Sequence, residues 1–542
     1  MSNLAASIRN PVEDLFKSEP AEQEEWRDAP PKCKQIRKRI HQHVKDVFSY
    51  LERRDAERPF DEVEKGLTGL LFTLGRLFLS YFLAWRHERC GRDCERLLKE
   101  FNGSGLPQPR TIGTFFGRVR YWRTYLRKKG AGGGIYPLDL ALRLIKDRFS
   151  MNVISRAARL ATLVSFDRVT ELLAMFMRWS PSKTTVEKAV LGLGRYTAEW
   201  FRCAPAPKGD GDVLVIQIDS KATPTATESE LAKRRGKRRA NPYADSPRHR
   251  GRDNRLRRGS KPRRKKGDKS KNGKAATLVV MYTLRKATDD KGRAILAGPL
   301  NRKVYASYAP KRHAFAIARR EADKRGFTKD SGRTIQLVTD GDEDLEAYAQ
   351  EYLPHAMHTL DIMHAMEYVW KAGRSLYQEG SEELAAWAKR MKDLMYQGKS
   401  KKVVARIAKL LGRIPKTGPG NKSRRDAVET AVGYLGKRVH MMNYDYLVAE
   451  DLEIASGAAE GGVNYVIAVR FDNGGMRWIR ERSEPLLQLR CIEINGDWDS
   501  FICFVQDELA AEAEDKGEIP ALLTTREAPL PTFGLSGIVD TT

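Results

Sequence analysis

The sequence contains little cysteine, with six residues in a chain of 542. So sparse a set cannot form the disulfide framework of a small secreted protein, and it favours a reducing, cytoplasmic environment. The first residues also lack a basic segment followed by an apolar core, so no secretory signal is expected. Cys90 and Cys94 have the spacing of half a zinc site, but no second pair follows nearby, which argues against zinc.

Long apolar runs are also missing. The longest candidate, from Leu67 to Trp85, is interrupted by Arg76, whereas a membrane-spanning helix needs about 20 predominantly apolar residues. We therefore predict a buried or dimer-forming helix here, with membrane anchoring as the lesser alternative. No membrane partner is expected.

Acidic residues are too few to balance the basic ones. The chain has 97 Lys and Arg against 70 Asp and Glu, a net charge of +27, which predicts a polyanionic partner. The segment Lys233 to Lys274 contains 20 Lys and Arg but only 3 Asp. Such a segment cannot form a packed core. It is either a nucleic-acid clamp or a solvated loop that binds nucleic acid non-specifically.

The amino-terminal part of the chain predicts two regions. Residues 1–105 favour charged helices, which either serve assembly or DNA contacts or form a solvated bundle. Residues 106–203 begin with alternating basic and apolar residues around Gly117, which predicts a β-hairpin. Short helices follow, as in a helix-turn-helix domain. A capping box of Thr184 and Glu187 is predicted to open the last of them.

The pattern then becomes α/β. The run VLVIQID predicts a buried strand that ends on Asp219, and TIQLVTD predicts another that ends on Asp340. The predicted order is that of the ribonuclease H fold, in which three antiparallel strands are followed by a helix, a strand, a helix and a strand. We predict the first part of such a core over residues 204–364, with the basic loop 233–274 inside it.

The remaining chain is predicted to interrupt and then complete this core. Residues 365–449 are helical and too long for a simple connection, so they are interpreted as an all-helical insertion domain. The core resumes over residues 450–506 with a helix that presents Glu460 near its start. Residues 507–542 are predicted to form an acidic, flexible tail. The fold class is thus multidomain, mainly α plus α/β.

Two aspartates at the ends of neighbouring strands would repel each other. A divalent cation such as magnesium is the simplest way to hold them together. The alternative is that Asp219 and Asp340 each cap the turn after a strand, as aspartate often does.

The order of these features resembles a known family. Asp219, Asp340, the DIMH sequence from Asp361 to His364, the helical insertion, and Glu460 in SGAAEGG followed by GGMRW are similar to a bacterial insertion-sequence transposase of the DDE type. The Kra-like branch is the nearest group. The likeness extends upstream to FFGRVRYWR and GIYPLDLAL, and covers roughly three quarters of the chain.

The resemblance implies a ribonuclease H-like enzyme that binds the terminal inverted repeats of a mobile element and catalyses DNA cleavage and strand transfer. It implies two Mg²⁺ ions per active site, replaceable by Mn²⁺, held by Asp219, Asp340 and Glu460. His364 would support catalysis, and Asp342 is better explained as the start of a helix. Double-stranded DNA of the element ends and target, a homodimer or higher homo-oligomer, and a nucleoid-associated location in a bacterial cytoplasm are further expectations.

Two other glutamates are alternatives to Glu460 as the third carboxylate. The glycines beside Glu460 weaken a helix, and Glu450 and Glu453 lie nearby. The SG before Glu460 and the GGMRW after it favour Glu460. In the insertion, Trp370 and Trp387 either stack on an unpaired base or, more commonly for tryptophan, fill a core.

Basic residues in three regions, together with Arg477, are the predicted DNA contacts. The hairpin alternates them with Tyr121, Trp122 and Tyr125, which suits a phosphate backbone. The predicted contacts are Arg118, Arg120 and Arg123 in the hairpin, Lys183 and Lys188 in the last short helix, Arg234, Arg238, Arg263 and Lys265 in the basic loop, and Arg477.

Two other functions compete with the transposase. One is a catalytically inactive DNA-binding descendant with an architectural or regulatory role. The other is a nuclease without joining activity.

Overall fold

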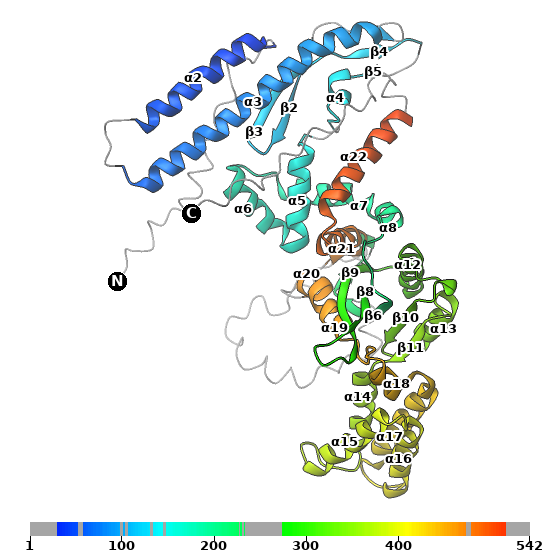
Figure 1. Cartoon of the computed structure of the whole chain (residues 1–542). Helices are drawn as coiled ribbons and strands as arrows, with labels where there is room; N and C mark the ends of the chain where they lie inside the picture. The colour runs from blue at the N-terminus through cyan, green and yellow to red at the C-terminus, as the bar shows by residue number, and fades with distance from the viewer. Residues whose placement is uncertain are drawn as a thin grey trace, which may run out of the picture. The chain divides into compact units, whose positions relative to one another are not determined.

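The computed structural model describes residues 30–52, 58–97, 101–102, 107–130, 134–144, 148–226, 228–229, 232, 274–472 and 478–515. The chain divides into two compact units, one of Met1–Leu193 with Asp499–Thr542 and one of Gly194–Trp498. Figure 1 shows the elements of both, which are taken in turn below.

The first unit begins with two packed helices, α2 (Cys33–Leu51) and α3 (Phe60–Leu97). Ile36 and Ile40 of α2 pack on Leu77 of α3 in a small core. The segment Phe60–Arg89 of α3 is long and apolar enough to cross a membrane by length and composition, and most of it is not buried. Burial of this helix, one of the two predicted alternatives, is therefore wrong for most of its length. A dimer-forming helix and the lesser alternative of a membrane anchor stay predictions.

A β-hairpin follows, as predicted. Strands β2 (Gln108–Thr114) and β3 (Gly117–Arg123) pair antiparallel, with Thr114 opposite Gly117 across a two-residue turn. Gly117 has φ +114°, a conformation that side chains rarely allow. The alternation in the sequence reflects the sheet, because Val119 is buried while Arg118 and Arg120 are exposed.

The rest of the first unit is mainly short helices. The helix predicted to open at Thr184 opens instead at Ser182, whose Oγ accepts from the Thr185 N–H at 3.3 Å. That predicted helix is also two helices, α7 and α8, which are separated after Gly194. The elements are β1 (Phe101–Asn102), β4 (Leu126–Lys128) and β5 (Gly134–Ile135) in one small sheet, then α4 (Pro137–Ala141), α5 (Met151–Leu163), α6 (Phe166–Met177), α7 (Lys183–Gly194) and, near the carboxyl end, α22 (Trp498–Asp515).

The second unit is built on a five-stranded mixed sheet of order β11-β10-β6-β8-β9. The central strand β6 pairs parallel with β10 and antiparallel with β8. Leu214, Val215 and Ile216 in β6 are fully buried, which explains the unbroken apolar run. The strands are β6 (Val213–Thr223), β8 (Lys274–Thr288), β9 (Ala294–Ser307), β10 (Thr334–Thr339) and β11 (Met357–Leu360).

Helices cover both faces of this sheet, with α12 and α13 on one side and α19 and α20 on the other (Figure 1). The coarse prediction of a chain that combines helical parts with an α/β part is confirmed. All five predicted strands are present, with β8 and β9 longer than expected. The prediction that the first strand ends on Asp219 is wrong, because β6 stays paired with β8 as far as Thr223. The elements next to the sheet are α8 (Thr197–Cys203), β7 (Thr225–Ala226), α12 (Lys311–Lys324), η2 (Lys329–Ser331), α13 (Glu343–Tyr352), α19 (Gly457–Gly462), η5 (Val463–Ala468), α20 (Val469–Phe471), β12 (Trp478–Ile479) and α21 (Arg480–Ile494).

The helices predicted between residues 365 and 449 are present and share their own apolar core. Trp387 is buried in that core and Trp370 packs against it, so the core interpretation fits both tryptophans better than base stacking. The elements are α14 (Ile362–Gly373), α15 (Glu382–Tyr396), α16 (Ser400–Lys409), η3 (Leu410–Arg413), α17 (Asn421–Lys437), η4 (Val439–Met441) and α18 (Tyr444–Ala449).

Candidate active site

Asp219 and Asp340 emerge from neighbouring strands at the same edge of the sheet. Strands β6 and β10 are parallel and in register, with Ile218 opposite Thr339, so the next residue of each is an aspartate. Both aspartates are half-buried. The Ser220 N–H donates to Asp219 Oδ1 at 2.6 Å, and the Asp342 N–H donates to Asp340 Oδ1 at 3.1 Å.

The charge on Asp219 is influenced by all three of the other predicted site residues. Burial is the main cause that raises the pKa of Asp219 above its ordinary value, and the negative charges of Asp340 and Glu460 raise it further. The Ser220 N–H and the nearby His364 oppose this shift. An aspartate from the central strand, one from the adjacent strand and a glutamate from a later helix therefore influence one another's charge.

Glu460 is exposed on a helix that a buried glutamine attaches to the sheet. The side chain of Gln217, in β6, accepts from the Ala459 N–H at 2.8 Å and donates to the Ala455 carbonyl at 3.3 Å. Gln217 also donates to the Tyr282 hydroxyl at 3.1 Å. A buried amide with three partners has its hydrogen-bonding groups largely satisfied, so this contact fixes the start of α19 beside β6.

The two glycines after Glu460 have different roles. A Cβ on Gly462 would lie 2.9 Å from Leu278 Cδ2 and 3.2 Å from Val280 Cγ2, whereas a Cβ on Gly461 would meet nothing within 4 Å. Gly462 thus allows the helix to approach strand β8 closely. Both glycines weaken the helix in isolation, but Gly462 is needed for its packing against the sheet.

Gly462→Ala is expected to destabilise the protein by about 1 kcal/mol, because about 1–3 kcal/mol of overpacking exceeds the gain in helix propensity. Gly461→Ala is the matched control, and it should stabilise by up to about 1 kcal/mol. Urea unfolding of both variants measures the difference. Equal stabilities would mean that the helix does not need its close approach to β8.

The helix that carries Glu460 widens into a π-helix, η5, immediately after Gly462. The buried guanidinium of Arg490, in α21, donates to the carbonyls of Val466 and Tyr465 at 2.8 and 2.6 Å. These bonds hold the widened turn in place. π-Helical turns inside α-helices are frequent at functional sites.

Asp361 is buried and joins the start of the helical insertion to its end. Its Oδ1 accepts from the Met363 N–H at 2.6 Å, capping α14, and its Oδ2 accepts from the Ser456 N–H at 3.0 Å and from the Ser456 hydroxyl. Ser456 is the residue before α19. Asp361 therefore links the start of α14 to the residue that precedes the helix of Glu460.

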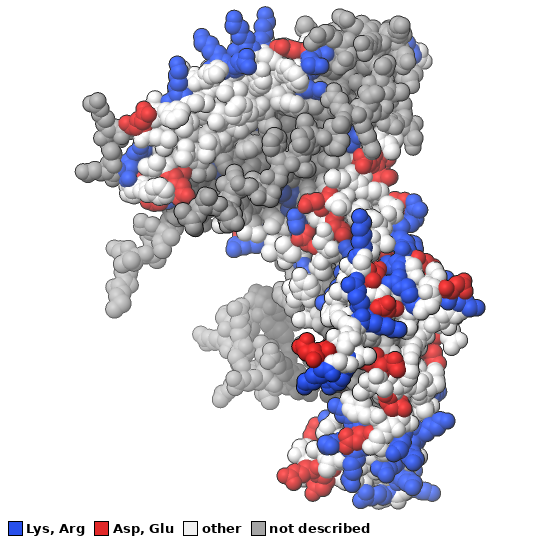
Figure 2. Space-filling model, in the orientation of Figure 1, with Lys and Arg blue, Asp and Glu red and all other residues white. Residues whose placement is uncertain are grey.

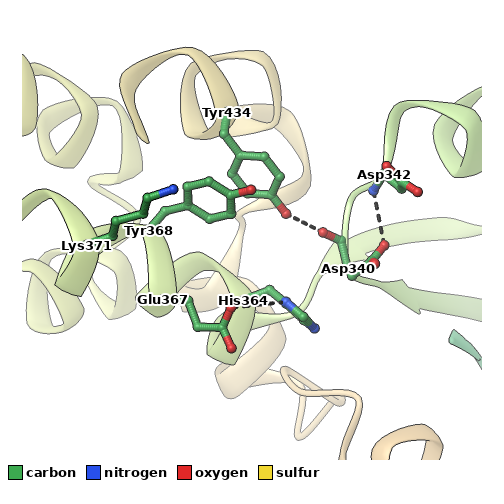
Figure 3. A pocket seen from close by; sticks show the side chains of 7 residues that line it. All are labelled: Asp340, Asp342, His364, Glu367, Tyr368, Lys371 and Tyr434. Atoms are coloured by element: carbon green, nitrogen blue, oxygen red, sulfur yellow. Dashed lines mark hydrogen bonds and ion pairs between the residues drawn. The ribbon is translucent and has the colours of Figure 1, made fainter. Parts of the chain in front are cut away.

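Between Asp340 and the insertion lies an open pocket of about 260 Å³ (Figure 3). One face of α14 contributes residues at helical spacing, from His364 to Lys371. His364 Nδ1 lies 3.7 Å from Glu367 Oε2, and the Asp342 carboxylate pairs with Lys311 at 2.7 Å. The pocket is lined by Asp340, Asp342, His364, Glu367, Tyr368, Lys371 and Tyr434.

Sequence reasoning missed the two tyrosines of this pocket. Tyr368 and Tyr434 stack with ring centroids 3.7 Å apart. Tyr434 lies 94 residues after Asp340 and contacts it through its hydroxyl. No local sequence pattern predicts such a contact. The spacing of Tyr434 and Arg438, one helical turn apart, is only a weak sign that both side chains share one helix face.

The predicted DNA contacts of the hairpin have different surroundings. Arg118 and Arg120 are exposed on β3. Arg123 instead pairs with the buried carboxylate of Asp139, which also accepts from the Tyr121 hydroxyl at 2.6 Å. Its placement argues against a DNA contact and in favour of attaching β3 to α4.

The expectation for the hairpin aromatics changes as well. Tyr121 is 3% and Trp122 9% exposed, so these rings are core residues and cannot stack on a nucleic acid. In α7, Lys183 and Lys188 are both exposed, and Lys183 forms a surface ion pair with Asp167 at 2.7 Å. Four predicted contacts in the basic loop and one after α20 lie outside the described residues, namely Arg234, Arg238, Arg263, Lys265 and Arg477.

The three carboxylates fit a divalent cation in donor chemistry. Their oxygens are the ligands that magnesium and manganese prefer, and the negative charges of Asp340 and Glu460 add to burial in raising the pKa of Asp219. Within the part of the chain that the structure describes, no group of three or more His, Cys, Asp or Glu side chains is arranged so that it could hold a metal ion. The carboxylate oxygens are thus chemically suited to the ion, but they do not form a complete metal site in this structure.

Comparison with known proteins gives no relative, since the chain matches no protein-family model and no curated protein.

Proposed function

We propose that this chain is a DDE-type DNA transposase with a ribonuclease H-like catalytic core. The observation that supports the proposal is that Asp219 and Asp340 directly follow paired residues of two neighbouring parallel strands. Glu460 lies near enough for its negative charge to add to the raised pKa of Asp219. The sheet supports it, because three antiparallel strands followed by two strands parallel to the first is the arrangement expected for that core.

Charge supports a DNA partner. The helical insertion from Ile362 to Ala449 has 17 Lys and Arg against 8 Asp and Glu, and Figure 2 shows blue side chains gathered over its far end. Non-specific affinity for DNA comes mainly from such neutralisation of phosphates. The exposed Arg118, Arg120 and Lys188 are the proposed contacts outside the insertion. Homo-oligomeric assembly on two element ends remains part of the proposal.

The chain's own residues would do three things in this reaction. Asp219, inside β6, and Asp340, directly after β10, provide two carboxylates on neighbouring strands, and Glu460 of α19 adds a third. Magnesium, when bound by them, would activate the attacking oxygen and stabilise the leaving oxygen. His364, half-exposed at the pocket beside Asp340, would contact the phosphate backbone of the DNA strand.

The direct test is incubation of the full-length protein and Mg²⁺ with labelled DNA carrying the ends of the element that encodes it. We expect nicked, hairpin or joined products, all dependent on the divalent ion and specific to the ends. DNA of the same length and scrambled sequence is the control. Tight end binding without any product would instead support the catalytically inactive DNA-binding alternative.

A further inference from the structure

The loop that carries Asp340 is attached to the helical insertion. The backbone carbonyl of Asp340 accepts from the Tyr434 hydroxyl, and that of Gly341 accepts from Arg438 Nε. Tyr434 is in α17, and Arg438 follows that helix directly. Figure 3 shows the tyrosine hydroxyl directed at the Asp340 carbonyl. Two consecutive carbonyls at a candidate catalytic residue are thus held by side chains nearly a hundred residues later.

The donors themselves are held firmly. The ring of Tyr434 stacks on Tyr368 with centroids 3.7 Å apart and planes 11° apart. The Arg438 guanidinium lies 4.1 Å from the centroid of the Tyr434 ring and donates through Nη1 to the Tyr434 carbonyl at 2.9 Å. Arg438 is only 4% exposed.

The shape of the loop fits these donors closely. Gly341 has φ +73°, and a Cβ there would lie 2.6 Å from Leu360 Cδ1 and 2.8 Å from Arg438 Cδ. The backbone therefore approaches the arginine stem as closely as a residue without a side chain allows. Such a turn has little freedom to shift while both donors are in place.

We propose that Tyr434 and Arg438 are positioning residues, which set the position of the Asp340 carboxylate relative to Asp219. The inference rests on the proposed function, because it assigns these two residues a role in presenting Asp340 to magnesium and DNA. They touch only the backbone of the loop. Loss of either should therefore weaken the response to Mg²⁺ rather than remove a reacting group.

The test compares Tyr434→Phe with Tyr444→Phe in the full-length protein. Both changes delete a tyrosine hydroxyl in the insertion that donates to a backbone carbonyl at a strand end, since Tyr444 donates to the Leu360 carbonyl at 2.9 Å. Tyr434 bonds the carbonyl of Asp340 itself, directly after β10, whereas Tyr444 bonds a carbonyl at the end of β11. Each variant should lose stability to a similar degree, because one hydrogen bond is removed in each.

The cleavage rate as a function of Mg²⁺ concentration distinguishes a positioning role from a role in stability alone. Supporting contacts of this kind typically alter metal affinity or activity about 10–100-fold. We expect Tyr434→Phe to need about tenfold more Mg²⁺ for half-maximal cleavage, with unchanged affinity for end DNA, whereas Tyr444→Phe keeps the wild-type requirement. Equal Mg²⁺ requirements in both variants would overturn the proposal.

Hydrogen–deuterium exchange of the 340–342 peptide provides a readout that does not depend on activity. Tyr434→Phe should accelerate exchange there and leave the rest of β10 protected, and Arg438→Lys, which cannot make both donations in the same geometry, should do the same. If the wild-type protein fails to cleave DNA, the proposed function fails while this experiment still tests the attachment. Unchanged exchange in both variants would show that the loop does not depend on them.

Discussion

Asp219→Asn is expected to reduce DNA cleavage by at least about a thousandfold, because removal of one metal-binding carboxylate costs several kcal/mol of transition-state stabilisation. DNA affinity should change little, since it depends on phosphate contacts elsewhere. The amide keeps the size of the side chain and the acceptor for the Ser220 N–H. Single-turnover cleavage of end DNA, beside a filter-binding titration, measures the two quantities.

The same substitution is expected to stabilise the protein without metal at neutral pH. The folded-state pKa of Asp219 is raised, mainly by burial, so the folded protein binds this proton more tightly than the unfolded chain does. Ionised Asp219 therefore destabilises the fold at pH values above the raised pKa. That penalty disappears as pH falls from the raised pKa towards the ordinary value for aspartate.

Melting temperatures across this pH range check the sign. Asp219→Asn should melt at a higher temperature than wild type at neutral pH, and the difference should shrink on acidification. Addition of Mg²⁺ should raise the melting temperature of wild type and have little effect on the variant. A variant that cleaves normally, or that gains the same stability from Mg²⁺ as wild type, would contradict the assignment.

Asp361→Ala is expected to cost about 3 kcal/mol of stability, because it leaves the Met363 N–H and both polar groups of Ser456 without their acceptor. Asp361 is 3% exposed, so water cannot readily replace the carboxylate. Urea unfolding gives the loss, and cleavage at low temperature shows whether the remaining folded protein is active.

Asp342→Ala is the matched control for this experiment. Asp342 also precedes a helix after a strand, but its carboxylate is exposed and pairs only at the surface with Lys311. Its removal should cost less than about 1 kcal/mol. If Asp361→Ala were as stable as wild type yet inactive, Asp361 would belong among the reacting groups rather than among the supporting ones.

The sequence predicts the sheet and its two aspartates well because both depend on local pattern. An apolar run that is buried on both faces and ends on a carboxylate identifies β6 and β10 without knowledge of their neighbours. Glu460 carries no such pattern, and its assignment rested on resemblance. Its helix is attached to the sheet through Ala459, whose partner Gln217 lies 242 residues earlier in the chain.

The incorrect predictions involve contacts between distant segments. The helix after Ser182 ends at Gly194, which lies against Pro485 so closely that a Cβ there would come within 2.3 Å of the proline Cβ. Alternation in the hairpin indicates a strand but does not show which face is covered, so Tyr121 and Trp122 were expected at a nucleic acid when they fill a core. Arg123 was expected there too, but the charge of Asp139 turns it inward.

The bond between Gln217 and Ala459 also has a consequence for the order of events during synthesis. Contacts between segments this far apart form only after the intervening chain has been made, and they close slowly because a long loop must be ordered first. A ribosome that has produced the sheet and both aspartates has therefore made no complete acidic site. Under the proposed function, a growing chain would bind DNA through its basic regions before it could cut it. Fragments from premature termination are then expected to occupy DNA ends without breaking them.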